Sequence, residues 1–280
     1  QRIADPAVAR ALLESVFKSE PAPVRGELLG ALSVNLSAGD LPFLESLSGD
    51  RAESVKSVAA RLIACVPGSP AHGARLAEAA ACFQKKSGAA SLMSRIGLGS
   101  AGDLAFVAPQ GGKATPAVVV TLFDGLGLGD LVAASGLPAE KLLASIMDER
   151  AVFDALAATA LANGDEATRA LLFEHKVAWM CAGPELNVHM LSRLMPLARG
   201  PMTVETANRL LSSKAWTGLI ARLSEPSATT RDDGAIVLIA LISPAGALPR
   251  LLAAIEPLHS NSAREARAFA EFVLAIPAHS

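Results

Sequence analysis

The stretch that decides the fold is LPFLESLSGDRAESVKSVAARLIACV, residues 41–66, which reads as two amphipathic helices joined by a tight turn. Gly49 can end the first helix, and Asp50 can accept the free N–H groups that begin the second. Apolar residues of the second helix recur every three to four positions and share one face: Val55, Val58, Ala59, Leu62, Ile63 and Val66. Neither helix can bury that face alone, so the segment predicts a helix pair that stacks on further pairs.

Helical periodicity, broken by Gly, Pro and Asp, covers most of the remaining chain, and its apolar stripes are expected to form the core. In the first expected helix the stripe comprises Val8, Leu12, Leu13, Val16 and Phe17. The connections between helices are short, which is typical of antiparallel neighbours.

The pattern changes at residues 87–129, where Gly is frequent and two short segments, 104–107 and 117–123, read as extended. The second segment is rich in β-branched residues, which strands prefer. We therefore predict an irregular insertion with a small β-hairpin. It lies between N-terminal helices, residues 1–86, and C-terminal helices, residues 130–280, and the whole forms one continuous solenoid.

Composition excludes several classes of protein. The 280 residues are 51% hydrophobic, which excludes disorder, and the three Cys are too few for a disulfide scaffold. Aromatics are only 4%, Tyr is absent, and the net charge is -2, so a general nucleic-acid binder is disfavoured. Mean hydropathy is +0.38, but the longest apolar run, residues 235–242, is too short to span a membrane.

The termini and cysteines give expectations about the compartment. Residues 1–20 carry charges throughout and lack an apolar signal core, so we expect no secretory leader. Cys65, Cys82 and Cys181 lie far apart in the sequence, which fits a reducing cytoplasm, and the first two read as buried thiols. The chain starts at Gln1 without Met, inside a helical pattern, so we expect a piece of a longer protein or a processed one.

Residues 41–62 resemble a HEAT repeat, with Pro42 near the start of the first helix, Asp50 at the turn and a basic residue after it. A wider set of positions resembles one bacterial family catalogued as a domain of unknown function. They are Asp5-Pro6, Ala11 to Glu14, Arg25, Leu28-Leu29, Asp40, Phe43 to Glu45, Asp50-Arg51, Val55, Ala59-Ala60, Val66 to Ser69, Arg75-Leu76, Asp124-Gly125, Leu156-Ala157, Gly164-Asp165, Ala170 to Leu172 and Leu191 to Pro196. The resemblance covers most of the chain and looks like the carboxy-terminal portion of a longer member. Phe153 and Ala167-Thr168 depart from it, since Trp is usual there.

Members of that family are typically encoded near a SWIM zinc-finger protein, a MoxR-type AAA ATPase and von Willebrand A-domain proteins. The resemblance therefore implies a protein partner among the ATPase or the von Willebrand A-domain neighbours. It implies a fold and a genomic context, and it carries no activity.

Three glycine-rich segments could suggest nucleotide binding, but none has the features that such a site needs. Residues 97–102 match G-x-G-x-x-G, but a helix-like segment precedes them and extended chain follows, the reverse of the order that a dinucleotide site needs. Residues 125–129 read as a turn into a helix, and residues 111–115 lack the spacing and hydroxyl of a phosphate-binding loop. The five His show no i, i+4 pairing, and neither C-x-x-C nor G-x-S-x-G occurs. We predict no catalytic residues, no cofactor and no metal.

The candidate interaction residues are the basic side chains near the best repeat: Arg51, Lys56, Arg61 and Arg75. They could line the concave face of a solenoid and meet an acidic partner. They could instead be structural, with Arg51 and Lys56 paired to Asp40, Asp50 or Glu53, and the interleaving of acidic and basic residues favours this alternative.

We predict an all-α, HEAT-like α-solenoid of short antiparallel helix pairs that serves as a non-catalytic, cytoplasmic scaffold for protein–protein interaction. Partner contact would fall on the concave face or on the insertion at residues 87–129. The alternative is a HEAT-like DNA-binding protein that resembles the alkylpurine glycosylases in architecture. That function needs a basic concave surface and groups around a flipped base, and Trp179 and Trp216 are the chain's two Trp residues.

Overall fold

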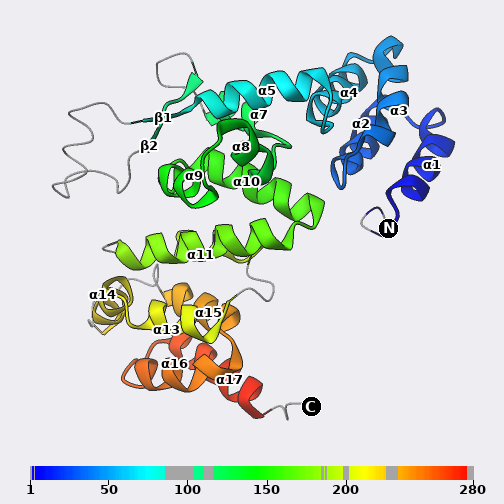
Figure 1. Cartoon of the computed structure of the whole chain (residues 1–280). Helices are drawn as coiled ribbons and strands as arrows, with labels where there is room; N and C mark the ends of the chain where they lie inside the picture. Colours follow the sequence, from blue (N-terminus) through cyan, green and yellow to red (C-terminus); the bar gives the residue numbers. More distant parts are fainter. Residues whose placement is uncertain are drawn as a thin grey trace. The chain divides into compact units, whose positions relative to one another are not determined.

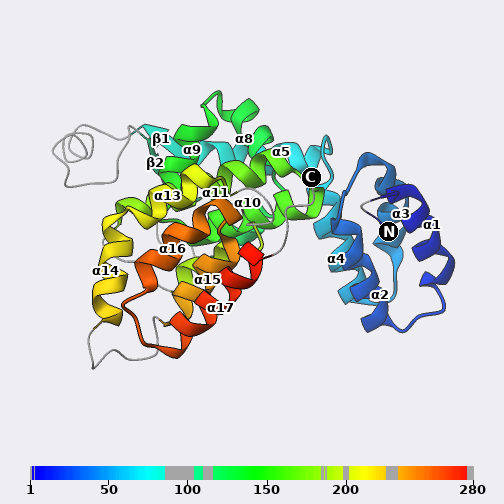
Figure 2. The ribbon, with the colours of Figure 1, turned by 90° about the horizontal axis from the view of Figure 1, so that it is seen from below.

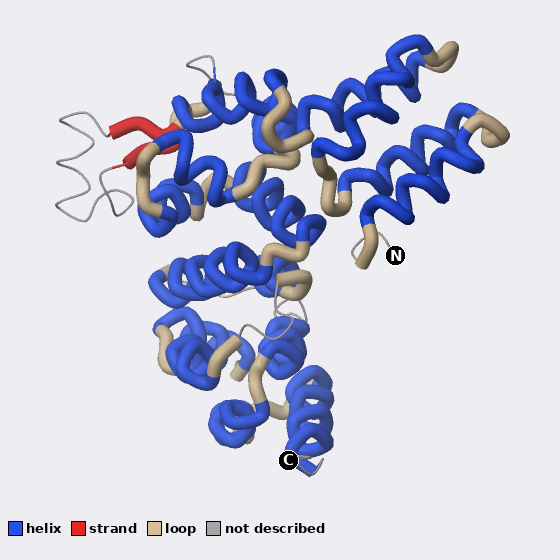
Figure 3. The backbone as a smooth tube through the Cα atoms, turned by 45° about the vertical axis from the view of Figure 1, so that its right-hand side comes forward, coloured by secondary structure: helices blue, strands red, loops and turns tan. Residues whose placement is uncertain are grey.

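The computed structural model describes residues 2, 4–85, 104–109, 116–183, 186, 188–197, 202–224 and 233–275. Most of this part of the chain is helical, which confirms the all-α class (Figures 1 and 3). The chain divides into two compact units, residues 1–168 and 169–280. The G-x-G-x-x-G match at residues 97–102, which is not expected to be a dinucleotide site, and residues 111–115 lie outside the described residues.

The first unit opens with a run of short helices and single 3-10 turns, labelled η. In chain order they are α1 (Pro6–Phe17), α2 (Ala22–Gly30), η1 (Ala31–Ser33), η2 (Ala38–Asp40), α3 (Leu41–Ser46), η3 (Leu47–Gly49), α4 (Glu53–Cys65) and α5 (Pro70–Ala81). Local sequence sets several of the boundaries. The Asp5 carboxylate accepts the N–H of Val8 at 3.0 Å to cap α1, and the Ser69 hydroxyl accepts the N–H of His72 at 3.1 Å to cap α5.

Helix α4 is central to this part of the unit, since it packs on α2, α3 and α5. Val55, Ala59 and Leu62 are buried on one face, which confirms the three-to-four spacing of the sequence. These three residues belong to one hydrophobic core that also contains Leu13, Phe17, Leu29, Leu32 and Leu44.

The predicted cap of α4 needs correction. The helix begins at Glu53, and the N-cap residue is Ala52, which has no capping side chain. One oxygen of Asp50 accepts the N–H of Ala52 at 2.8 Å, and the other pairs with Arg25. Asp50 therefore orders the turn before the helix rather than the helix itself, and the Ala52 hydrogen bond, with Arg25, lowers its pKa.

The rest of the first unit contains β1 (Phe83–Lys85), β2 (Leu104–Phe106), α7 (Pro116–Phe123), α8 (Leu128–Ser135), α9 (Ala139–Ile146) and α10 (Arg150–Asn163). The two strands pair antiparallel, with Phe83 opposite Phe106 and Lys85 opposite Leu104. The predicted extended segment at 104–107 is thus a strand. Its partner precedes residue 87, at the place where the sequence predicts the end of a helix.

The other predicted strand, residues 117–123, is wrong, because this segment is helix α7. Its buried residues are Val119, Leu122 and Phe123, which follow a helical spacing, while Val118 and Val120 are 45% exposed. A preference of β-branched residues for strands is weak, and burial of one helical face outweighs it here. Phe123 also packs on the ribbon, with ring centroids 6.3 Å from Phe83 and 5.9 Å from Phe106.

The second unit contains most of α11 (Glu166–Ala182), followed by α12 (Val188–Leu194), α13 (Val204–Leu211), α14 (Lys214–Leu223), α15 (Asp233–Ile242), η5 (Ala245–Ala247), α16 (Leu248–Ile255) and α17 (Asn261–Ala275). Helix α15 packs on α12 and α17, and α16 packs on α13 and α17. Figure 2 shows α15, α16 and α17 side by side. The Arg267 guanidinium donates to the carbonyls of Ile255, Glu256 and Leu258 at 2.6–2.7 Å, which satisfies the end of α16.

No single helix among the described residues has both the length and the hydropathy to cross a membrane. Helices α7 and α8 meet the length and composition criteria only when taken together, and they bend by 87° at the break between them.

A buried ion cluster fixes the start of the chain. Asp40 is fully buried and accepts hydrogen bonds from Arg2 at 2.6 Å, from Arg10 at 3.1 Å and from the Ser37 N–H at 2.9 Å. Burial alone would raise the pKa of this carboxyl, but the bonds from Arg2, Ser37 and Arg10 outweigh burial and lower it. Asp40 thereby joins α1 to the loop before α3.

Replacement of Asp40 by Asn should destabilise the first unit by about 3 kcal/mol, because it leaves the guanidiniums of Arg2 and Arg10 without their buried countercharge. Urea unfolding followed by circular dichroism measures the change. Asp148→Asn, an exposed site with the same change of charge, should have an effect within about 0.5 kcal/mol. Equal effects of the two variants would refute the role of Asp40.

The stability difference between the natural chain and Asp40→Asn should also depend on pH. Because the folded pKa of Asp40 lies below the usual 3.8, its stabilising effect is present above about pH 4. It is lost as the pH falls through the folded pKa. The stability difference between the natural chain and Asp40→Asn should therefore shrink below about pH 3.5. A difference that stays constant down to about pH 2 would contradict the assignment.

Candidate functional site

The structure separates the four candidate basic residues into two pairs. Arg51 precedes α4, is exposed, and has no ion pair within the described part of the chain. Lys56 lies in the first turns of α4 and pairs with Glu53 at 2.5 Å, one of the pairings that the sequence suggests. The predicted pairing of these two cations with Asp40 or Asp50 is not found, because Arg2, Arg10 and Arg25 occupy those carboxylates.

Arg61 and Arg75 instead meet at Asp124, in the turn between α7 and α8. Arg61 Nη1 donates to Asp124 Oδ2 at 2.8 Å. Arg75 donates to the carbonyl oxygens of Ala64 at 2.8 Å and Leu122 at 3.1 Å, and also to that of Asp124. These carbonyls lie at the ends of α4 and α7, where the helices leave acceptors unsatisfied. Arg75 therefore fastens the α7–α8 turn to the end of α4.

Cys65 lies beneath this turn. Its Sγ is 3.4 Å from the Asp124 carbonyl oxygen and accepts a hydrogen bond from Arg75 Nη1 at 3.2 Å. Burial raises the pKa of the Cys65 thiol, and the Arg75 hydrogen bond opposes that rise without cancelling it. The sulfur is thus a protonated thiol near neutral pH and a weak nucleophile.

Gly125 allows this close approach. It has a φ of +72°, and a Cβ built on it would lie 2.8 Å from the Cβ of Cys65 and 3.0 Å from its Sγ. A side chain at this position would meet both backbone strain and a collision. The sequence indicates only a turn at residues 125–129, which the structure confirms, and the contact with Cys65 adds a reason for the glycine.

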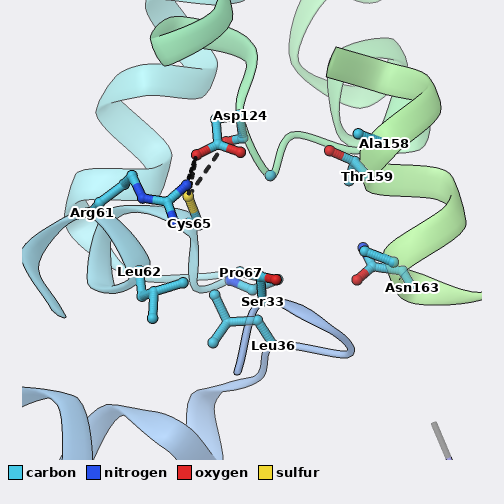
Figure 4. Close-up of a pocket in the computed structure, with 12 residues that line it drawn as sticks. Ser33, Leu36, Arg61, Leu62, Cys65, Pro67, Asp124, Ala158, Thr159 and Asn163 are labelled. Carbon is cyan, nitrogen blue, oxygen red and sulfur yellow. Dashed lines mark hydrogen bonds and ion pairs between the residues drawn. The ribbon is translucent and has the colours of Figure 1, made fainter. Parts of the chain in front are cut away.

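A cavity of about 160 Å³ opens beside the Arg61–Asp124 pair (Figure 4). Its walls come from η1 and the following loop, from α4, from the α7–α8 turn and from α10. The lining residues are Ser33, Leu36, Arg61, Leu62, Cys65, Pro67, Asp124, Gly125, Ala158, Thr159, Ala162 and Asn163. The N–H of Asn35 donates to the Ala162 carbonyl at 3.3 Å, which holds the η1 loop against α10.

Thr159 is the polar residue of the cavity that lies deepest in the protein. It is 7% exposed, and its hydroxyl has no hydrogen-bond partner among the described residues. Figure 4 shows the hydroxyl directed from α10 into the space that faces Arg61 and Asp124. Of the lining residues, only Arg61 is a candidate site residue predicted from the sequence. The rest of the cavity was missed because its walls come from segments up to about 130 residues apart, with no recognisable motif.

A second surface feature lies on α1. Val8 is 51% exposed, Leu12 56% and Val16 40%, at i, i+4 and i+8, so they form one stripe along the helix. Of the apolar residues expected in the core at this helix, only Leu13 and Phe17 are buried. The expectation is wrong for the other three, because periodicity identifies an apolar face but not a neighbour that covers it.

Over residues 1–241 the sequence matches the model of the family DUF5691, a family of unknown function, so the chain belongs to this family. No curated protein and no solved structure matches the chain. Among the described residues, no group of three or more His, Cys, Asp or Glu side chains could hold a metal ion.

Gly125→Ala should destabilise the first unit by about 2–4 kcal/mol, because the new methyl group collides with Cys65 in addition to straining the backbone. Gly136→Ala is the matched control, since Gly136 has a φ of +65° and no atom within 4 Å of a built Cβ. That control should cost only about 1 kcal/mol of strain. Urea unfolding compares the two, and equal losses would show that the Cys65 contact has no energetic weight.

Proposed function

We propose that this member of DUF5691 is a non-catalytic, HEAT-like scaffold that binds a partner protein through the outer face of α1. The stacking of helices in the first unit supports the HEAT-like part of the proposal. Helix α1 packs on α2, α2 on α4, and α4 on α5, in the order of the chain, as successive layers of a solenoid do.

The exposed stripe of Val8, Leu12 and Val16 carries the proposal. Apolar stripes on a protein surface mark sites of interaction. Exposed Ala11 and Ser15 lie between the three large residues, and small side chains let another helix approach closely.

The chemistry of this face defines the partner. The Ser15 hydroxyl donates to the Leu12 carbonyl at 2.7 Å, so it presents no unsatisfied donor. Arg10 points its charge at Asp40 and Glu14 rather than along the stripe. A neutral, apolar strip one helix long fits an amphipathic helix with apolar residues at i, i+3 and i+4. The resemblance to the family suggests that the ATPase or a von Willebrand A-domain protein supplies it.

The cellular setting belongs to the same proposal. Cys65 and Cys82 are buried free thiols, and Cys181 is a partly buried one, which supports a reducing cytoplasm. No observation specifically favours the alternative function, DNA binding. Two of the candidate cations already bond within the protein, because Arg61 donates to Asp124 and Arg75 donates to backbone carbonyls.

Leu12→Asp should weaken binding to the partner by at least about tenfold, because it places a charge in the middle of an apolar interface. Biolayer interferometry with a purified MoxR-type ATPase and purified von Willebrand A-domain proteins, the partners that the resemblance implies, measures this loss. Circular dichroism should show an unchanged fold, since the Leu12 side chain is 56% exposed.

Leu241→Asp is the matched control, because Leu241 is 45% exposed and lies on α15 in the second unit. It should change the affinity by less than about twofold. Absence of binding to every one of these proteins would overturn the proposal, and so would an equal loss in both variants.

A further inference from the structure

The cavity beside α10 contains hydrogen-bonding groups that the protein leaves unused. A hydroxyl that lines a cavity bonds to the protein, to water or to a bound molecule. Thr159 is 7% exposed and has no such partner within the described residues, and its hydroxyl points into the cavity (Figure 4). A bound molecule would supply the missing bond.

The opposite wall offers a donor and an acceptor side by side. Arg61 uses one Nη1 bond to reach Asp124 Oδ2, and no described residue accepts from its remaining N–H groups. Asp124 Oδ1 likewise accepts from no described residue, while Oδ2 takes Arg61 and a long contact of 3.9 Å from Cys65 Sγ. Arg61 and Asp124 already neutralise each other. A neutral molecule can therefore bond to the free N–H groups of Arg61 and to Asp124 Oδ1 without breaking this ion pair.

The size and lining of the cavity restrict the shape of that molecule. A cavity of about 150 Å³ is large enough for benzene, and this one measures about 160 Å³. Leu36, Leu62 and Pro67 form its floor below the charged pair (Figure 4). One planar ring can therefore lie on the apolar floor and direct a polar edge toward Arg61 and Asp124.

We infer that this cavity binds a small neutral molecule built on a single planar ring that carries an adjacent hydrogen-bond donor and acceptor, as in aryl carboxamides and pyrimidine bases. Its donor meets Asp124 Oδ1, its acceptor meets the free N–H groups of Arg61, and Thr159 bonds a further polar atom. This activity is separate from partner binding on α1, and it uses none of the residues of the exposed stripe.

Ligand-observed NMR titration of the full chain with benzamide and with uracil tests this inference. Saturable binding of at least one probe is expected, with an affinity about three- to tenfold weaker in Thr159→Val, which replaces the hydroxyl with a methyl group of similar shape. Thr159→Val should melt at about the same temperature, because the Thr159 hydroxyl bonds no described residue. Lower affinity without lower stability separates a binding role from a structural one.

Two controls complete the experiment. Thr217→Val lies outside the cavity, on α14, and should leave the affinity unchanged, as should Leu12→Asp. Toluene has the ring without the polar edge, and benzoate has a full negative charge, so both should bind at least about tenfold more weakly than benzamide. The inference is overturned if neither probe binds, if Thr159→Val binds as the natural chain does, or if toluene or benzoate binds as well as benzamide.

Discussion

The first unit depends on one guanidinium that reaches the ends of two helices. Arg75 lies on α5, and its donors satisfy the Ala64 carbonyl at the end of α4 and the Leu122 carbonyl at the end of α7. A cation is favourable at both places, since the carboxyl end of a helix carries partial negative charge and unsatisfied oxygens. The α7–α8 turn, and with it Asp124 and Gly125, takes its position from this contact. Asp124 therefore takes its place in the cavity wall from the backbone bonds of Arg75, a residue that does not itself line the cavity.

Small residues make these close contacts possible, and the composition of the chain reflects this. Gly125 approaches Cys65 to a distance that no side chain would tolerate, and Ala59 is buried where α4 meets its neighbours. With aromatics at only 4%, few large rings fill space, and three of them gather where β1, β2 and α7 meet: Phe83, Phe106 and Phe123. Most of the other buried side chains in the described chain are aliphatic, chiefly Leu, Ala, Val and Ile.

The sequence predicts what local rules decide. The spacing of Val55, Ala59 and Leu62 identifies a buried face, because this signal acts within one or two turns of a helix. Residues 117–123 show the limit of such rules, since local preference indicates a strand where tertiary burial selects a helix. The candidate site is even harder to predict from the sequence. Arg61 and Arg75 stand out as basic residues, but Asp124 is 63 residues from Arg61, and no periodicity relates them.

The two features proposed for function share one segment of the first unit. Asp40 holds Arg10 of α1 and Arg2, and Arg2 also donates to the Val34 carbonyl at 2.5 Å. Ser33 and Leu36, in the same loop, line the cavity, and the loop is fixed to α10 through the Asn35 N–H. A partner that moves α1 would change the position of this loop only by working against the Asp40 cluster. Asp40 is therefore one structural connection between the exposed stripe and the cavity, beside the packing of α1 on α2 and of α2 on α4.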